Sequence, residues 1–251
     1  MIKMKIVVTK VFLSCIGLTI YTAAQAVDVS EAVSENLKKI DFKITPSYYQ
    51  SSDRNDATDI NLRVSRGEHT GWIGRYGNSN GFVQDRIGYS NNHDFGLVRL
   101  VSSVEYGGGG YAGVSASTEI GGDTFAILGI DRTNLRPFYN LGFDPSDAID
   151  LGIGTRALSN IEISLLHIRE NRLDTQRKAT HFVWRYKPSD LQRITIDTSY
   201  KSGFSDDGFF VRGYAISVTY DYDQYFVRLA RDQYVNFSAN NLNRLSLGVR
   251  F

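Results

Sequence analysis

The chain has 251 residues, 28 basic and 27 acidic side chains, four histidines and one cysteine. A single cysteine excludes an internal disulfide and a Cys-based zinc site, and a near-neutral charge without a basic run gives no support for nucleic-acid binding. Beyond the first 26 residues no segment approaches the 18 or so consecutive apolar residues of a membrane helix. A secreted β-protein and a membrane β-barrel both fit, because a barrel strand needs apolar residues only at alternate positions.

Residues 1–26 predict a secretory signal peptide. Three lysines precede an apolar run over 11–20, and Ala24-Gln25-Ala26 ends the segment with a small-x-small cleavage pattern. The run is shorter than the roughly 20 residues of a spanning helix, and the sequence before Cys15 is a poor lipobox. A membrane anchor and a lipoprotein are therefore weaker alternatives. Cleavage would leave 25 basic and 27 acidic residues and no cysteine.

Residues 27–38 have a different pattern from the rest of the mature chain. Val29, Val33 and Leu37 recur every four residues, and Asp28 with Glu31 is compatible with a capping box. The segment is either a short helix or a frayed tail.

From residue 39 onward apolar and polar residues alternate, which predicts β-strands. The pattern gives fourteen segments, most of a length suited to crossing a bilayer, with twelve strands as the next possibility. The predicted strands are 39–50, 57–65, 70–76, 82–90, 96–105, 111–120, 123–131, 148–156, 160–169, 179–187, 191–201, 209–220, 224–234 and 242–251.

The connections between these strands alternate in length. Short turns such as 91–94, 120–123 and 221–224 alternate with longer loops such as 171–178 and 202–208. Tight turns at one end and longer loops at the other are typical of outer-membrane barrels. An even number of strands then places both ends of the barrel on the turn side.

The polar face of the strands is predicted to line a lumen. In 191–201, for example, Ile194 and Ile196 alternate with Arg193, Thr195 and Asp197. Bases outnumber acids on this predicted face, which indicates a positive lumen that favours anions, whereas a closed barrel packed with Arg–carboxylate pairs is the alternative. The predicted basic ladder is Arg63, Arg75, Arg86, Arg99, Arg156, Arg185, Arg193, Arg228 and Arg244.

The longest connection, residues 131–148, is rich in aromatic and proline residues. We expect it to fold over or into the barrel mouth as a constriction, the alternative being an exposed lid. The predicted lid residues are Arg132, Arg136, Phe138, Tyr139 and Asp144. Its aspartates lack a calcium-loop pattern, so we predict no metal site and no cofactor.

An enzyme is the least favoured class. His167 and His181 flank one loop, with Ser164 and Glu170 close to His167 in sequence, but no nucleophile motif is present. We therefore predict no catalytic residues and keep a hydrolase at the loop-side rim only as an alternative.

The final segment, NRLSLGVRF, has Leu245, Leu247, Val249 and Phe251 at alternate positions and ends on the phenylalanine. It resembles the C-terminal signature of Gram-negative outer-membrane β-barrel proteins. The resemblance implies an all-β, transmembrane, antiparallel up-and-down barrel that reaches the outer membrane by the general secretory route and periplasmic chaperones. It also implies that the barrel assembly machinery reads the terminal strand.

Together these features predict a porin-type channel for small solutes, with anions such as acidic oligosaccharides favoured by the lumenal charge. A non-conducting structural or adhesion barrel is the main alternative. The expected partners are outer-membrane lipid, lipopolysaccharide and the solutes themselves, without nucleic acid. No loop is long enough to suggest a trimer latch, so we expect a monomer.

Overall fold

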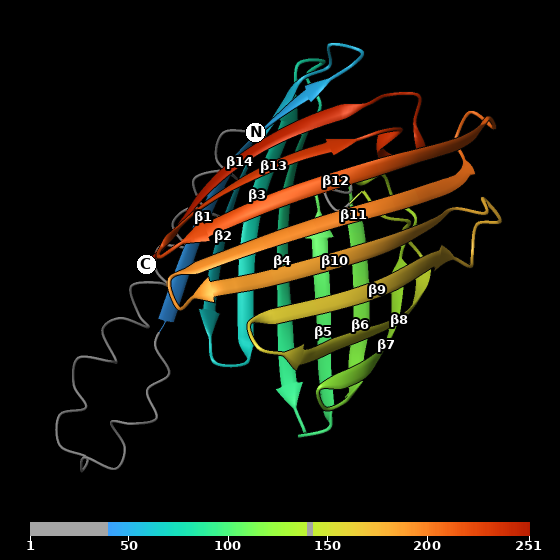
Figure 1. Cartoon of the computed structure of the whole chain (residues 1–251). Coiled ribbons are helices and arrows are strands. Elements are labelled where there is room, and N and C mark those ends of the chain that lie inside the picture. The colour runs from blue at the N-terminus through green and yellow to red at the C-terminus, as the bar shows by residue number, and fades with distance from the viewer. Residues whose placement is uncertain (1–39, 140–142) are drawn as a thin grey trace. The chain divides into compact units, whose positions relative to one another are not determined.

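The structure, a computed structural model, describes residues 40–139 and 143–251, so the predicted signal peptide and N-terminal helix or tail lie outside the described residues. No helix in these ranges is long and apolar enough to cross a membrane. Fourteen strands and one 3-10 turn are present (Figure 1). They are β1 (Ile40–Ser51), β2 (Ala57–Arg66), β3 (His69–Asn78), β4 (Val83–Asp94), β5 (Val98–Gly107), β6 (Tyr111–Gly121), β7 (Thr124–Thr133), β8 (Ala148–Leu158), β9 (Ile161–Glu170), β10 (Lys178–Ser189), β11 (Gln192–Phe204), β12 (Phe210–Tyr222), β13 (Tyr225–Asp232), η1 (Val235–Phe237) and β14 (Leu242–Arg250).

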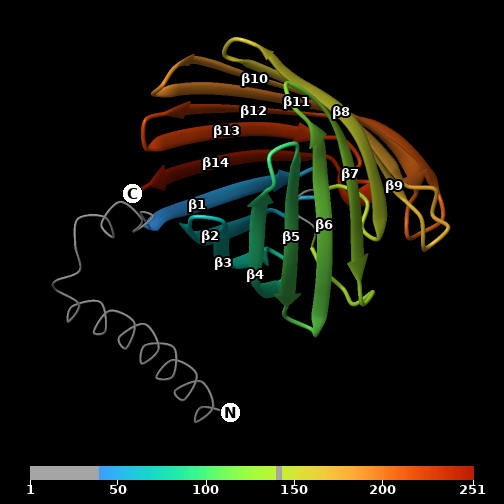
Figure 2. The same cartoon turned by 90° about the horizontal axis from the view of Figure 1, so that it is seen from below.

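The strands form one closed antiparallel barrel in which each pairs with its neighbours in sequence and β1 pairs with β14 (Figure 2). Closure satisfies backbone groups that an open sheet edge would leave unpaired. Phe251 takes part in this closure. Its backbone N–H donates to the Phe42 carbonyl at 3.0 Å, and its carbonyl accepts from the Phe42 N–H at 2.8 Å. The two rings stack with their centres 5.6 Å apart. The predicted all-β barrel of fourteen strands is confirmed.

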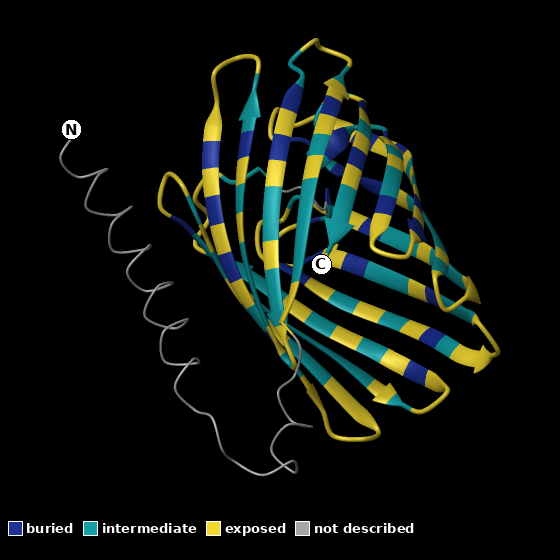
Figure 3. Ribbon diagram, turned by 90° about the vertical axis from the view of Figure 1, so that its left-hand side faces the viewer, coloured by how far each residue is buried: buried dark blue, intermediate teal, exposed yellow. Residues whose placement is uncertain are grey.

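Side chains alternate between the two faces of the wall, as the bands of buried and exposed residues show (Figure 3). In β12, Tyr214, Ile216 and Val218 are exposed on the outside, whereas Gly213 and Ala215 face inward. Along β14 the predicted assembly-signal residues Leu245, Leu247, Val249 and Phe251 have the outward parity. This is the pattern of a barrel whose outer surface meets an apolar phase.

Loops and turns are sorted to opposite ends of the barrel. One predicted turn is misplaced: β4 continues through Asp94, so the chain reverses at 95–97 and not at 91–94. Side-chain contacts support this extension of β4, because Asn91 contacts the His69 ring at 2.9 Å and His93 pairs with Glu68 at 3.0 Å. Asn91 and Asn92 are residues that favour turns, but in this structure both pair with β5.

Candidate functional site

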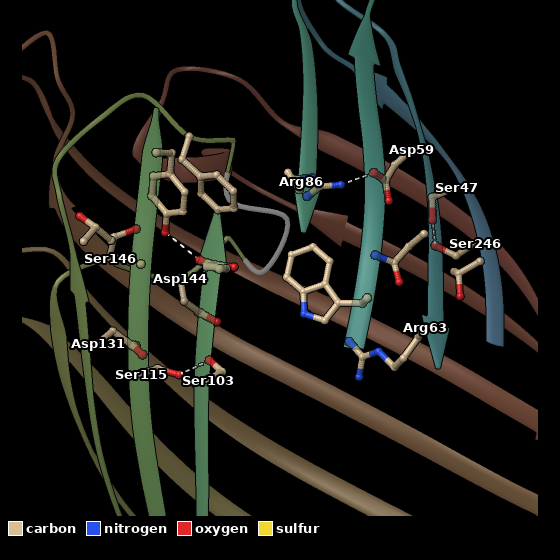
Figure 4. A pocket seen from close by; sticks show the side chains of 18 of the residues that line it. Ser47, Asp59, Arg63, Arg86, Ser103, Ser115, Asp131, Asp144, Ser146 and Ser246 are labelled. Atoms are coloured by element: carbon tan, nitrogen blue, oxygen red, sulfur yellow. Dashed lines mark hydrogen bonds and ion pairs between the residues drawn. The ribbon is translucent and has the colours of Figure 1, made fainter. Parts of the chain in front are cut away.

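The inward side chains surround a cavity of about 590 Å³ inside the barrel. Its lining comes from β1 to β7, β13 and β14 and from the β7–β8 loop, residues 134–147. Serine hydroxyls pair across strands within it, Ser47 with Ser246 at 2.8 Å and Ser103 with Ser115 at 2.7 Å. Figure 4 shows these pairs on opposite sides of the cavity, so polar groups line both sides of it.

One side of the cavity carries cations, which we call the basic wall. Its members are Lys43 of β1, Arg63 of β2, Arg228 of β13 and Arg244 of β14. Lys43 lies 4.4 Å from the Phe226 ring centre, and Arg228 Nε–H donates to the Thr219 hydroxyl at 2.9 Å. Arg63 makes no ion pair with any described residue. Cations that lack a fixed carboxylate partner attract anions from solution.

The other side carries carboxylates, which we call the acidic wall. Its members are Glu105 of β5, Asp131 of β7 and Asp144 of the β7–β8 loop. Glu105 accepts a hydrogen bond from the Tyr111 hydroxyl at 2.7 Å, and Asp144 contacts the His181 ring at 2.8 Å. Asp131 and Asp144 lie across the cavity from Arg63 (Figure 4). The two walls therefore set up a field across the lumen rather than along it.

Most other inward charges neutralise one another. Arg156 pairs with Glu119 at 2.6 Å, and Arg193 pairs with Asp221 at 3.2 Å. The remaining pairs are Arg86 with Asp59, Arg185 with Glu162, Lys201 with Asp232 and Arg250 with Asp221. Paired charges contribute little net field, so Lys43, Arg63 and Arg228 of the basic wall and Glu105 and Asp131 of the acidic wall dominate the potential inside the cavity.

Strand register gives the position of each predicted ladder residue. Arg63, Arg86, Arg99, Arg156, Arg185, Arg193, Arg228 and Arg244 have inward parity. The prediction for Arg75 is wrong: it opposes Ile60 on the outer face and pairs there with Asp85 at 3.0 Å. Trp72 and Tyr76 occupy the inward positions of β3 instead. Because the inward face of β3 carries aromatic residues, an assignment from polarity alone placed Arg75 on the wrong face.

The structure gives no excess of inward bases over acids. Asp131, Asp150, Asp221 and Asp232 all have inward parity. The sequence pattern placed Asp131 and Asp221 in connections, but β7 and β12 are longer than predicted and hold both in the wall. Charge in this lumen is separated rather than uniformly positive.

The β7–β8 loop folds inward and contacts the lumenal face of several strands. Phe138 stacks on Tyr111 of β6 with ring centres 4.0 Å apart, and Tyr139 stacks on Tyr76 of β3 at 4.1 Å. Gln84 of β4 fixes the backbone between them, because its amide donates to the Pro137 carbonyl at 3.3 Å and accepts from the Tyr139 N–H at 3.1 Å. These contacts hold the loop across the lumen.

Two predicted lid residues lie elsewhere. Arg132 is the penultimate residue of β7 and has outward parity opposite Val114, although both residues border the cavity, and it donates to the Ala148 carbonyl at 3.2 Å. Arg136 is exposed on the loop. Phe138, Tyr139 and Asp144 therefore form the inward part of the loop.

His181 of β10 links the β7–β8 loop to strand β11. Its Nδ1 lies 2.9 Å from Asp197 of β11 and its Nε2 2.8 Å from Asp144. Ionised carboxylates only accept hydrogen bonds, so both contacts form together only when both ring nitrogens carry protons. The two distances thus fit an imidazolium that donates to two ionised carboxylates.

The histidine pair of the hydrolase alternative is not assembled. His167 has outward parity and contacts the Thr180 hydroxyl at 2.8 Å, on the opposite face of the wall from His181. Glu170 is occupied by the β9–β10 loop, where it accepts from the Thr175 hydroxyl at 3.0 Å. Within residues 40–139 and 143–251 no cluster of His, Cys, Asp or Glu has metal-ligand geometry.

A second loop also packs inside the barrel at its loop end. Val235 and Phe237 of η1, in the β13–β14 loop, are buried. Val235 joins Tyr49, Tyr76 and Phe143 in a hydrophobic cluster. This cluster was not predicted from the sequence, although Tyr49 shares the parity of lumenal Lys43, Thr45 and Ser47. The sequence signal for this cluster is an aromatic residue near the end of a strand, on the face that is otherwise polar.

Asp147 fastens the end of the β7–β8 loop, and Asp147→Asn is expected to loosen it at neutral pH. The carboxylate, 1% exposed, accepts from the Thr133 N–H at 3.1 Å and from Arg172 at 2.8 Å. Burial alone would raise the pKa of Asp147, but these hydrogen bonds together hold it below its usual range. Its stabilising effect is therefore complete above the unfolded pKa of about 3.9 and is lost as pH falls through the folded pKa.

The measurement is amide exchange at Thr133 near neutral pH and in acid. We expect the variant to exchange about tenfold faster than the unmodified chain at neutral pH and the two to converge in acid. Equal exchange at neutral pH would show that the carboxylate does not fasten the loop.

Comparisons with known proteins place the fold. No protein-family model and no curated protein matches the sequence. Among solved structures, the Acinetobacter baumannii outer membrane protein Omp33 has a TM-score of 0.58 at 10% identity, over 86% of this chain and 98% of that chain. The KdgM porin in complex with disordered oligogalacturonate has a TM-score of 0.49 at 9% identity, over 83% of this chain and 99% of that chain. Salmonella typhi OmpF in complex with daunomycin has a TM-score of 0.45 at 10% identity, over 85% of this chain and 97% of that chain.

Identities this low show a shared fold and leave the solute open. A closed fourteen-strand wall, an apolar outer face and a polar lumen agree with that fold. The chain is an outer-membrane porin-like β-barrel in its fold.

Proposed function

We propose that the chain is a porin-type channel of the Gram-negative outer membrane, through which small polar solutes diffuse past a constriction formed by Phe138, Tyr139 and Asp144 of the β7–β8 loop. The observation that carries this proposal is the charged cavity of about 590 Å³ beneath an inward-folded loop. Export by the general secretory route, insertion by the assembly machinery and a monomeric state belong to the same proposal.

The separated walls refine the expected solute. Carboxylates, including those of acidic oligosaccharides, would contact the basic wall, where Arg63 and Lys43 lack ion-pair partners among the described residues. The acidic wall would contact a cationic group in a solute that also carries one. We therefore expect weak overall ion selectivity, with a preference for solutes that bear both charges.

The test is conductance of the refolded barrel in a planar bilayer under a salt gradient. Replacing Lys43, Arg63 and Arg228 with glutamine should shift the reversal potential toward cation selectivity. Replacing Glu105 and Asp131 with glutamine and asparagine should shift it toward anions. Unchanged potentials in both variants would show that ions do not pass between these walls.

A non-conducting barrel is the second candidate. The cluster of Tyr49, Tyr76, Phe143 and Val235 at the loop end favours it, because buried aromatic side chains leave little room for water. Folded protein that inserts into bilayers but never conducts would support this candidate and contradict the channel.

A further inference from the structure

The outer face carries a row of cations near its loop end. Register places Arg169 of β9 opposite Lys178 of β10, Lys178 opposite Ser202 of β11, and Ser202 opposite Arg212 of β12. Figure 1 shows these four strands side by side. Neighbouring strands lie about 4.8 Å apart, so the row spans roughly 14 Å. Arg231, near the loop end of β13, lies on the same face.

The three cations of this row, Arg169, Lys178 and Arg212, form what we call the outer basic patch. All are exposed, and none makes an ion pair with a described residue. Like charges directly opposite each other, as at Arg169 and Lys178, destabilise a sheet. Elsewhere on the outer face Arg75 is balanced by Asp85. The patch therefore lacks a counter-charge of the kind that Asp85 supplies for Arg75.

Below the patch the outer surface changes in a regular order. The next row holds His167, Thr180, Tyr200 and Tyr214, and the two tyrosine rings lie 5.2 Å apart. The row after that holds Leu165, Phe182, Thr198 and Ile216. Cations, then amphipathic rings, then apolar side chains match the headgroup, interface and hydrocarbon levels of a leaflet.

A shallow groove runs through these lower rows. It has a volume of about 680 Å³ and is lined by Leu165, Phe182, Tyr200, Tyr214 and Ile216, with Arg231 also in its lining. An apolar groove next to a set of unbalanced cations suits an amphiphile with an anionic head. Longer loops of such barrels face the cell exterior, so the headgroup would belong to the outer leaflet.

We propose that the outer basic patch binds the phosphate groups of a phosphorylated glycolipid of the outer leaflet, with an acyl chain in the groove below. Arginine forks bind phosphate oxygens in pairs, and a row of this length can contact two phosphates. The inference rests on the outer-membrane location proposed above but not on conduction.

The probe is diphosphorylated lipid A titrated onto the folded barrel in detergent, with bound lipid counted by native mass spectrometry. R169Q/K178Q/R212Q should bind about a hundredfold more weakly, since each basic residue contributes about 1 kcal/mol, or roughly fivefold, near an anionic headgroup. The matched control R75Q/D85N, also on the outer face, should bind as the unmodified barrel does. Dephosphorylated lipid A should bind weakly to all three proteins.

Three results would overturn the site. They are unchanged affinity in the triple variant, equal loss in the control, and equal binding of dephosphorylated lipid. Inorganic phosphate that binds as tightly as the lipid would show an anion site without a lipid. Insertion of the triple variant into vesicles, measured separately, distinguishes failure of this site from failure of the membrane location, and folding is checked by heat-modifiable gel mobility.

Discussion

Replacing Phe138 and Tyr139 together with alanine is expected to increase the time that the barrel spends in its highest conductance level. Both rings stack on inward aromatics, Tyr111 and Tyr76, and hold the β7–β8 loop across the lumen. Each stacked pair contributes about 0.5–1.5 kcal/mol beyond its buried area. Loss of both should raise the population of the displaced loop by roughly five- to a hundredfold.

Single-channel recording of the refolded protein measures this directly. A matched control is Tyr214→Ala, which removes an aromatic ring that contacts Tyr200 on the outer face and should leave the levels and their occupancy unchanged. His181→Gln provides a second way to free the loop, because glutamine cannot bridge Asp144 and Asp197 as an imidazolium does. Identical gating in the double variant and the unmodified channel would show that the loop is not the constriction.

Arg86→Met is expected to lower the free energy of unfolding by about 3–5 kcal/mol. Arg86 and Asp59 form an ion pair whose side chains are each 4% exposed. The guanidinium crosses β3 above Gly74, where an added Cβ would lie 3.4 Å from Arg86 Nη2. Removing the cation leaves a buried carboxylate without its partner, which costs more than the pair contributes.

Urea unfolding of the barrel in lipid vesicles tests this. Lys187→Met is the control. Its pair with Asp190 joins the end of β10 to the turn that follows, the two side chains are 53% and 97% exposed, and loss of the pair should change stability by about 1 kcal/mol or less. The double variant Arg86→Met with Asp59→Leu should recover much of the lost stability. Equal effects of Arg86→Met and Lys187→Met would contradict a buried, energetically important pair.

The strands themselves were predictable from the sequence. Alternation at Ile194, Ile196 and their neighbours is a local property with period two, so it fixes which residues share a face without knowledge of the partner strand. The sorted turns and loops and the terminal Phe251 then indicated closure, which the β1–β14 pairing confirms. Local assignment failed where polarity and parity disagreed, as at Arg75 and in the turn at 91–94.

The lumen depends on contacts that no local pattern contains. Ser47 meets Ser246 from 199 residues away, and His181 meets Asp144 across 37 residues. An alternating wall, and hence a barrel, follows from the order of residues along the chain, because strand periodicity and chain closure are consequences of backbone geometry. Which charges oppose one another, and the inward fold of the β7–β8 loop, depend instead on the curvature that brings distant strands around one cavity.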